Sequence, residues 1–168
     1  MFDYFGIPTI SRRGLEADDV IASVVERITR DHPEVEIRIV SKDKDLEQLL
    51  GPKVTMYDIH TETTIDEAYL LENKGITPQQ VIDYLAMVGD TADNVPGVPQ
   101  IGPKAATELL QRFGDLETIL ARVDEVKGAK KQENLRAHAD TARAGRELIR
   151  LHADVPIDIP WGAGLLHA

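Results

Sequence analysis

The order in which strand-like and helix-like segments follow one another constrains the fold of this chain more than any other feature. The two types alternate over residues 17–88: a helical stripe of apolar residues over 17–28 precedes an alternating, β-branched run over 35–41, and the pattern then repeats. After Gly89 the strand signals give way to helical ones. The alternation predicts an α/β fold with a mostly parallel central sheet and flanking helices, followed by an all-α region.

This change of pattern divides the expected structure into two parts. Residues 1–88 are predicted to form an α/β core, and residues 89–168 a helical region with a C-terminal tail. Local signals mark several helix ends: Asp66 opens one helix and Gly75 closes it, and Pro78 stands at the first position of the next. One long helical segment is expected over residues 130–152.

Composition excludes several classes of protein. There is no cysteine, which rules out disulfides and thiolate metal sites, and no apolar run is long enough to cross a bilayer. These features suit a cytoplasmic protein. The net charge of -10 is carried by residues 1–100, while residues 101–168 are balanced. Such an acidic surface does not indicate a nonspecific DNA-binding protein, because phosphate contacts need cations.

Three clusters of carboxylates stand out in the acidic half of the chain. They are Glu16, Asp18 and Asp19; Asp43 and Asp45; and Asp90 and Asp93. Each has a structural explanation, as a first-turn acid, a helix cap or a turn former. Yet the first two follow strand-like segments, expected over residues 7–11 and 35–41, at the sheet edge where α/β proteins bind ligands. Converging carboxylates would hold two Mg²⁺ or Mn²⁺ ions, which prefer oxygen ligands.

A glycine-rich turn follows the third cluster, in the sequence "NVPGVPQIGPKAATELL". Gly97 and Gly102 permit unusual backbone shapes, and Gly102 stands where a helix begins. Free amides there, together with Lys104, would bind a phosphate of the DNA backbone. An ordinary connection between helices is the alternative. Further on, Lys127, Lys130 and Lys131 suit either a DNA backbone contact or a solvated helix end.

The stretches "GLEADDVIASV", "SKDKDLEQLL" and "GDTADNVPGVPQIGPKAATELL", in this order and spacing, resemble the 5′ nuclease (flap endonuclease) family, which includes the 5′–3′ exonuclease domain of bacterial DNA polymerase I. The resemblance implies a PIN-like α/β core and a helix–three-turn–helix that binds duplex DNA. It implies a metal-dependent 5′–3′ exonuclease and 5′-flap endonuclease acting in replication and repair, with a polymerase domain in the parent protein.

The resemblance also assigns residues. The carboxylates at positions 16, 18 and 19 resemble ligands of one metal, and those at positions 43, 45, 90 and 93 resemble ligands of the other. The family's duplex-backbone contact, which often holds K⁺ on backbone carbonyls, is similar to residues Gly97, Val98, Gln100, Gly102 and Lys104.

Three departures from the family pattern stand beside these assignments. The family's first strand with its leading aspartate, and its helical arch, have no counterpart here, and Gln100 stands where glycine is common. The alternative to a nuclease is therefore a catalytically impaired fragment that only binds duplex DNA.

Overall fold

The computed structural model describes residues 9–11, 13–91 and 93–158. The chain divides into two compact units, each treated separately below: unit 1 comprises residues 1–36 and 151–168, and unit 2 comprises residues 37–150. None of the helices in the described ranges is long and apolar enough to cross a membrane.

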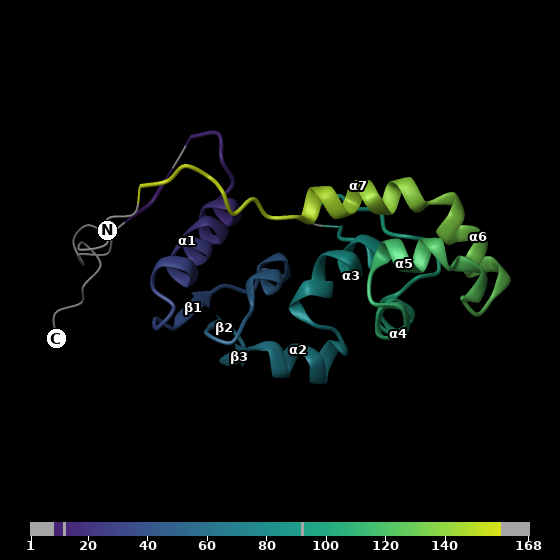
Figure 1. Ribbon diagram of the computed structural model, residues 1–168, viewed down its shortest axis with the longest axis horizontal. Coiled ribbons are helices and arrows are strands. Elements are labelled where there is room, and N and C mark those ends of the chain that lie inside the picture. Colours follow the sequence, from purple (N-terminus) through teal and green to yellow (C-terminus); the bar gives the residue numbers. More distant parts are fainter. Residues whose placement is uncertain (1–8, 12, 92, 159–168) are drawn as a thin grey trace. The chain divides into compact units, whose positions relative to one another are not determined.

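Unit 1 is built on helix α1 (Ala17–Asp31), with the extended segment 151–158 lying along it (Figure 1). Val20, Val155 and Ile157 form its small buried core. The buried Ser23 hydroxyl joins the two segments, because it accepts a hydrogen bond from the Val155 amide at 3.0 Å. Arg27 adds a second tie by donating to the Ile157 carbonyl at 2.6 Å.

Unit 2 begins with a three-stranded sheet in the order β1-β2-β3. Strands β1 (Ile37–Val40) and β2 (Val54–Asp58) are parallel, with Ile37 opposite Val54. The short 3₁₀ helix η2 (Lys44–Leu49) lies between them in the chain. Strand β3 (Thr63–Ile65) pairs antiparallel with β2. The predicted α/β class is confirmed, and the described sheet is mixed, with one parallel and one antiparallel pair.

Strand β3 was not predicted from the sequence. It has three residues and directly precedes a helix, so it is too short to show the alternation that marks a strand. It forms because a tight turn after β2, with Glu62 in the left-handed region (φ 53°), returns the chain beside that strand.

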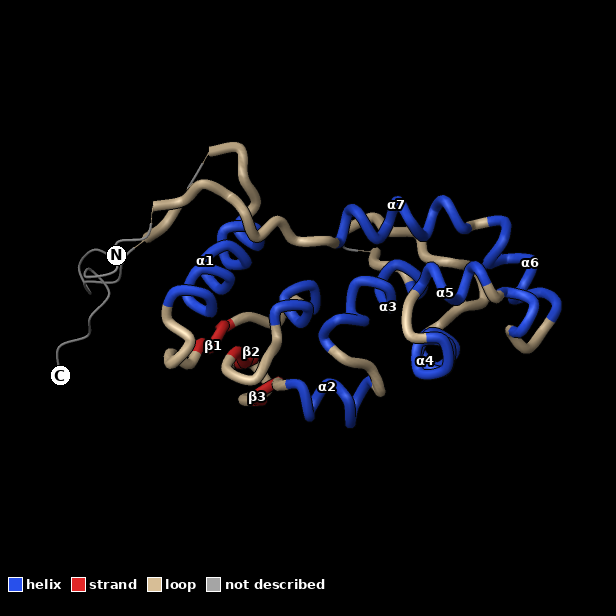
Figure 2. The backbone as a smooth tube through the Cα atoms, viewed as in Figure 1, coloured by secondary structure: helices blue, strands red, loops and turns tan. Residues whose placement is uncertain are grey.

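Helices make up the rest of unit 2, and the first of them, α2, continues directly from β3 (Figure 2). They are α2 (Glu67–Lys74), η3 (Pro78–Gln80), α3 (Val81–Val88), α4 (Pro103–Phe113), α5 (Leu116–Ala121), η4 (Val123–Glu125), α6 (Ala129–Ala137) and α7 (Ala139–Ile149). The predicted ends of α2 are confirmed: the Asp66 carboxylate accepts from the Tyr69 amide at 2.7 Å, and Gly75 has a left-handed backbone.

The segment predicted as one long helix over 130–152 is two helices with a break at His138. The break lets each helix make its own contacts. On α6, the buried Asn134 side chain donates to the Pro99 carbonyl at 2.7 Å. On α7, which packs against α3, Arg146 lies 2.9 Å from the buried Asp83 carboxylate.

Candidate metal centre and duplex-binding turn

Three of the predicted carboxylates come together in unit 2. One oxygen each from Asp45, Asp90 and Asp93 lies within 4.8 Å of the others. Asp45 and Asp90 are buried, and Asp93 is exposed. They come from two chain segments: Asp45 follows the carboxyl end of β1, and the other two follow the end of α3. The cluster therefore has a buried floor and an open side.

A closed turn holds the second segment in place. Helix α3 ends at Gly89, which has a positive φ of 88°. The backbones of Asp90 and Val95 then exchange two hydrogen bonds of 2.8 and 2.7 Å. Gly145 of α7 faces this turn, since a Cβ added there would lie 2.9 Å from a Val95 methyl group. The backbone of Asp90 is thus fixed by its two hydrogen bonds to Val95, and Val95 packs against α7.

Lys44 supplies the positive charge next to these acids. Its ammonium lies 2.6 Å from an Asp90 carboxylate oxygen, and the Asp90 side chain is only 1% exposed. This hydrogen bond raises the pKa of Lys44. A single ammonium offsets only part of the charge of the three clustered carboxylates.

Burial and like charge act together on Asp45. Loss of hydration raises its pKa to about 7, and the negative charges of Asp93, Asp43 and Asp90 add to the effect. Burial, followed by the charges of Asp90 and Asp43, also raises the pKa of Asp93. A proton or a divalent cation at the cluster would relieve this repulsion.

The cluster fits a divalent cation. Asp45 Oδ1 is buried and has no hydrogen-bond donor among the described residues, and an unpartnered buried oxygen is costly unless a cation or proton satisfies it. All the ligand atoms are carboxylate oxygens, which favours hard ions such as Mg²⁺ or Mn²⁺ over Zn²⁺. The cluster of Asp45, Asp90 and Asp93 is called the acidic cluster below.

Asp43 caps a short helix, which is the structural role that the sequence offered as the alternative to metal binding. Its carboxylate accepts a hydrogen bond of 3.1 Å from the Asp45 amide and caps η2. The cap orients the first turn of η2, and Asp43 contributes its charge to the acidic cluster from outside it.

The remaining predicted carboxylates lie at the start of α1, in unit 1. Asp18 and Asp19 are half-buried in the first turn, and Glu16 is exposed at the N-cap. Asp19 accepts a hydrogen bond of 2.8 Å from the His152 amide, so it also anchors the extended segment of its unit. Their assignment to a metal stays a prediction.

The glycine turn leads from the acidic cluster to α4. Gln100 has φ 66° and is exposed, as are Gly102 and Lys104. Pro103 occupies the first position of α4, so the amides of Lys104 and Ala105 lie in a first turn that provides no intrahelical partner. These groups suit the predicted contact with phosphate.

Gly97 and Val98 have a different place in the turn. Val98 is buried, its amide donates to Met87 at 2.7 Å, and its carbonyl accepts from Ile101 at 3.0 Å. Gly97 lies directly against the end of α3, with φ 70°. Both residues hold the turn in shape, and their part in a contact with DNA stays a prediction, as it does for the exposed residues beside them.

Two residues of this region were missed from the sequence. Lys44 has a visible signal in the sequence, because it alternates with Asp43 and Asp45. Asn134 carried no signal, because its bond to Pro99 joins residues 35 positions apart.

The chain belongs to the 5′–3′ exonuclease family. Residues 1–75 match the family's N-terminal resolvase-like domain, and residues 76–166 match its C-terminal SAM fold. The two matches meet between residues 75 and 76, so the predicted domains 1–88 and 89–168 remain a proposal.

Curated relatives include a polymerase and a separate nuclease. The chain is 44% identical over 162 residues to DNA polymerase I of Rhizobium leguminosarum, covering 96% of this chain and 16% of the relative. It is 36% identical over 152 residues to the flap endonuclease Xni of Aeromonas hydrophila, covering 90% of this chain and 56% of the relative. The chain thus spans only part of each of these relatives.

Solved structures of bacteriophage T5 flap endonuclease share the fold. One, a complex with DNA and metal ions, has a TM-score of 0.80 and 26% identity, covering 90% of this chain and 55% of that one. Another, with zinc bound, has a TM-score of 0.78 and 28% identity, covering 86% and 53%. The catalytic core of Rad2 with DNA substrate has a TM-score of 0.57 at 17% identity, which shows a shared fold alone.

Proposed function

We propose that this chain is part of a divalent-metal-dependent 5′–3′ exonuclease and 5′-flap endonuclease that hydrolyses DNA phosphodiesters in the bacterial cytoplasm during replication and repair. The observation that carries the proposal is the acidic cluster, whose unpartnered buried oxygen a divalent cation would satisfy. Membership of the 5′–3′ exonuclease family supports the reaction type. The polymerase relatives support a polymerase domain as partner in the parent protein.

The proposed metal content is two Mg²⁺ or Mn²⁺ ions. Asp45, Asp90 and Asp93 would hold one ion, with Asp43 acting through water, and Glu16, Asp18 and Asp19 would hold the other. Such ions, when bound, lower the pKa of water and stabilise negative charge on the transferring phosphoryl group. A K⁺ ion on carbonyls of the glycine turn remains a prediction from the resemblance.

Separate groups of the chain would hold the metal ion and position the DNA. The acidic cluster supplies oxygen donors on a backbone fixed by the Asp90–Val95 bonds. The turn at Gln100 and Gly102, with Lys104, would bind the duplex backbone without reading base sequence. The scissile phosphodiester near a 5′ flap or 5′ end would then lie over the open side of the acidic cluster.

The test is cleavage of a labelled 5′-flap DNA by this chain in Mn²⁺, alongside Asp90→Asn. We expect the substitution to slow cleavage at least about 100-fold, because it removes charge used in the transition state, while the duplex Kd changes less than about threefold. Asp140→Asn is the matched control, since Asp140 is exposed and outside the acidic cluster. An equal loss of rate and affinity would contradict the metal role, and duplex binding without any cleavage would leave the binding-only fragment.

A further inference from the structure

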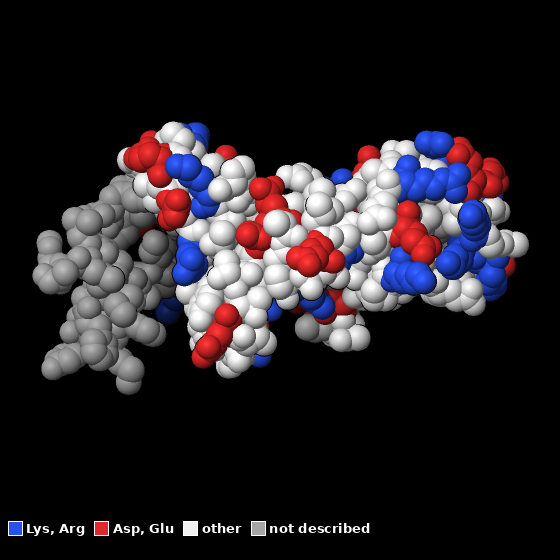
Figure 3. Space-filling model, turned by 90° about the horizontal axis from the view of Figure 1, so that it is seen from below, with Lys and Arg blue, Asp and Glu red and all other residues white. Residues whose placement is uncertain are grey.

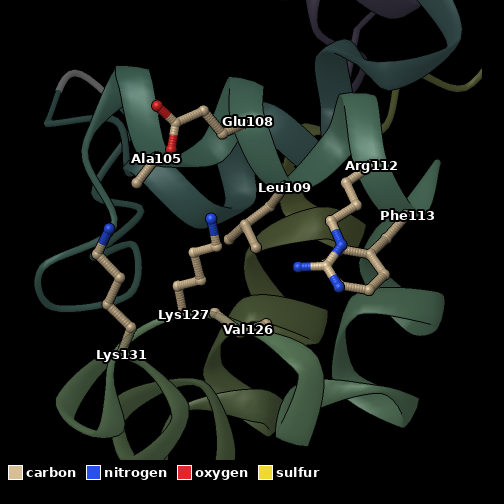
Figure 4. A pocket seen from close by; sticks show the side chains of 8 residues that line it. All are labelled: Ala105, Glu108, Leu109, Arg112, Phe113, Val126, Lys127 and Lys131. Atoms are coloured by element: carbon tan, nitrogen blue, oxygen red, sulfur yellow. The ribbon is translucent and has the colours of Figure 1, made fainter.

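A hollow of about 190 Å³ lies between α4 and the start of α6 (Figure 4). It is lined by Ala105, Glu108, Leu109, Arg112, Phe113, Val126, Lys127 and Lys131. The buried Leu109, Phe113 and Val126 form an apolar floor. Lys127 and Lys131 extend in the same direction, towards the first turns of α4 (Figure 4). This is called the lysine hollow below.

The charges of the lysine hollow are poorly offset. Within residues 9–11, 13–91 and 93–158, neither Lys127 nor Lys131 has a carboxylate within 4.0 Å. Two nearby cations do have carboxylate partners: Lys130 pairs with Glu133 at 3.0 Å, and Arg112 pairs with Glu125 at 3.5 Å. Glu108 is the one acid among the lining residues, so the hollow is net positive in a chain of net charge -10. Figure 3 shows Lys and Arg gathered over this part of unit 2, with carboxylates between them.

Local structure fixes both lysines. Gly128 has φ 103°, a conformation that favours glycine, and it turns the chain between Lys127 and the first turn of α6. Gln132 donates a hydrogen bond to the Val126 carbonyl at 2.7 Å, which stabilises that turn. Asn134 ties α6 to Pro99 of the glycine turn. The helix that carries Lys131 is therefore tied to the predicted duplex contact, and Lys127 directly precedes that helix.

The lysine hollow is continuous with that contact. An adjoining depression of about 470 Å³ is lined by Gly102, Pro103, Lys104, Ala105, Glu108 and Lys131. Lys131 belongs to both depressions, as do Ala105 and Glu108. A chain of phosphates held at Lys104 thus has a connected, positively charged path towards Lys127.

We propose that the lysine hollow binds a second phosphate group of the duplex DNA backbone, reached from the phosphate at Gly102 and Lys104 along the path that Lys131 lines. The inference rests on the proposed function and extends its DNA interface to α6. A DNA strand suits this path because it offers regularly spaced phosphates, and its sugars can lie against the apolar floor. Each phosphate neutralised by a lysine releases counterions, so the contact has a measurable salt signature.

The experiment measures the Kd of a blunt, fluorescein-labelled DNA duplex by anisotropy at several salt concentrations, in Ca²⁺ to prevent cleavage. The proteins are the wild-type chain, Lys127→Gln, Lys131→Gln, Lys104→Gln and Lys130→Gln. Lys130→Gln is the matched control. It removes one positive charge from α6, the helix that carries Lys131, but Lys130 does not line the hollow. We expect Lys131→Gln and Lys127→Gln each to weaken binding roughly three- to tenfold and to lower the slope of log Kd against log salt by about 0.9.

The outcomes separate this inference from the proposed function. Loss with Lys104→Gln but none with the substitutions at 127 and 131 would overturn the lysine hollow alone. Equal loss with all four lysine variants would also overturn it, since the effect would then be one of general charge. Absence of any salt-dependent duplex binding by the wild-type chain would overturn both proposals. Weakened binding of a polyglutamate peptide, with the DNA slope unchanged, would assign the hollow to an acidic protein partner instead.

Discussion

Lys44 acts as the resident cation of the acidic cluster when no metal is bound. Its ammonium lies 2.6 Å from buried Asp90, where a divalent ion would also take a ligand. Lys44→Met removes this competitor, so we expect Mn²⁺ to bind roughly tenfold more tightly, within the range of one charge-assisted hydrogen bond. Isothermal calorimetry measures the change.

Lys42→Met is the control for this prediction, because Lys42 is exposed and has no carboxylate within 4.0 Å in the described part of the chain. Weaker binding by Lys44→Met would instead make Lys44 a support for Asp90.

Protons compete with metal at Asp45, whose pKa burial and neighbouring carboxylates raise to about 7. Because its folded-state pKa is raised, Asp45 stabilises the metal-free fold at low pH, and this contribution is lost as pH rises through 7. Metal needs the ionised carboxylate, so its affinity follows the opposite course. We expect Mn²⁺ to bind roughly tenfold more weakly at pH 6 than at pH 8, which is the effect of one proton of that pKa. Asp45→Asn should weaken binding at every pH and remove most of the pH dependence, and an unchanged dependence would place the titrating group elsewhere.

At the scale of elements, the end of α3 joins the acidic cluster to the glycine turn, which is the predicted duplex contact. A Cβ on Gly97 would lie 2.6 Å from the Val88 carbonyl oxygen and 2.7 Å from the Gly89 amide. Gly97→Ala therefore has to shift the backbone that leads into Asp90, and it adds strain at φ 70°. We expect it to lower stability by roughly 2–4 kcal/mol and to weaken Mn²⁺ binding at least tenfold. Calorimetry and urea unfolding measure the two effects.

Gly102→Ala provides the matched comparison for that prediction. Gly102 has extended backbone angles, and a Cβ there would meet no atom within 4 Å. This variant should keep its stability and its Mn²⁺ affinity and lose only duplex affinity. If Gly97→Ala kept wild-type Mn²⁺ affinity as well, the turn and the acidic cluster would be independent of one another.

The elements predicted well from the sequence are those set by local chemistry. Asp66 and Gly75 mark the ends of α2 because a cap and a left-handed glycine act within one helical turn. Strand β3 was missed because its pairing with β2 is not local, and α6 and α7 were not separated because their contacts, such as the Asn134–Pro99 bond, are not local either. For the same reason, spacing alone identified the carboxylates but did not show that Asp45, Asp90 and Asp93 in particular share one pocket.

At the scale of the whole molecule, the seven predicted metal ligands are divided between the two units. Asp43, Asp45, Asp90 and Asp93 belong to unit 2, while Glu16, Asp18 and Asp19 belong to unit 1. Any ion that binds only the folded state stabilises the elements that supply its ligands, by an amount that grows with the logarithm of the ratio of free ion to Kd once that ratio exceeds one. Metal binding should therefore leave a separate signature in each unit.

Hydrogen–deuterium exchange with and without Mn²⁺ measures the amide exchange rates of the two units separately. If both carboxylate sets hold metal, exchange should slow at least about tenfold in the first turn of α1 and in residues 89–95, as roughly 1.4 kcal/mol of added local stability requires. Ala121 at the end of α5 and its helical neighbours serve as the internal reference, since no predicted ligand lies on that helix. Protection confined to residues 43–45 and 89–95 would contradict a metal role for Glu16, Asp18 and Asp19. Those side chains would then serve only their helix and the Asp19–His152 bond.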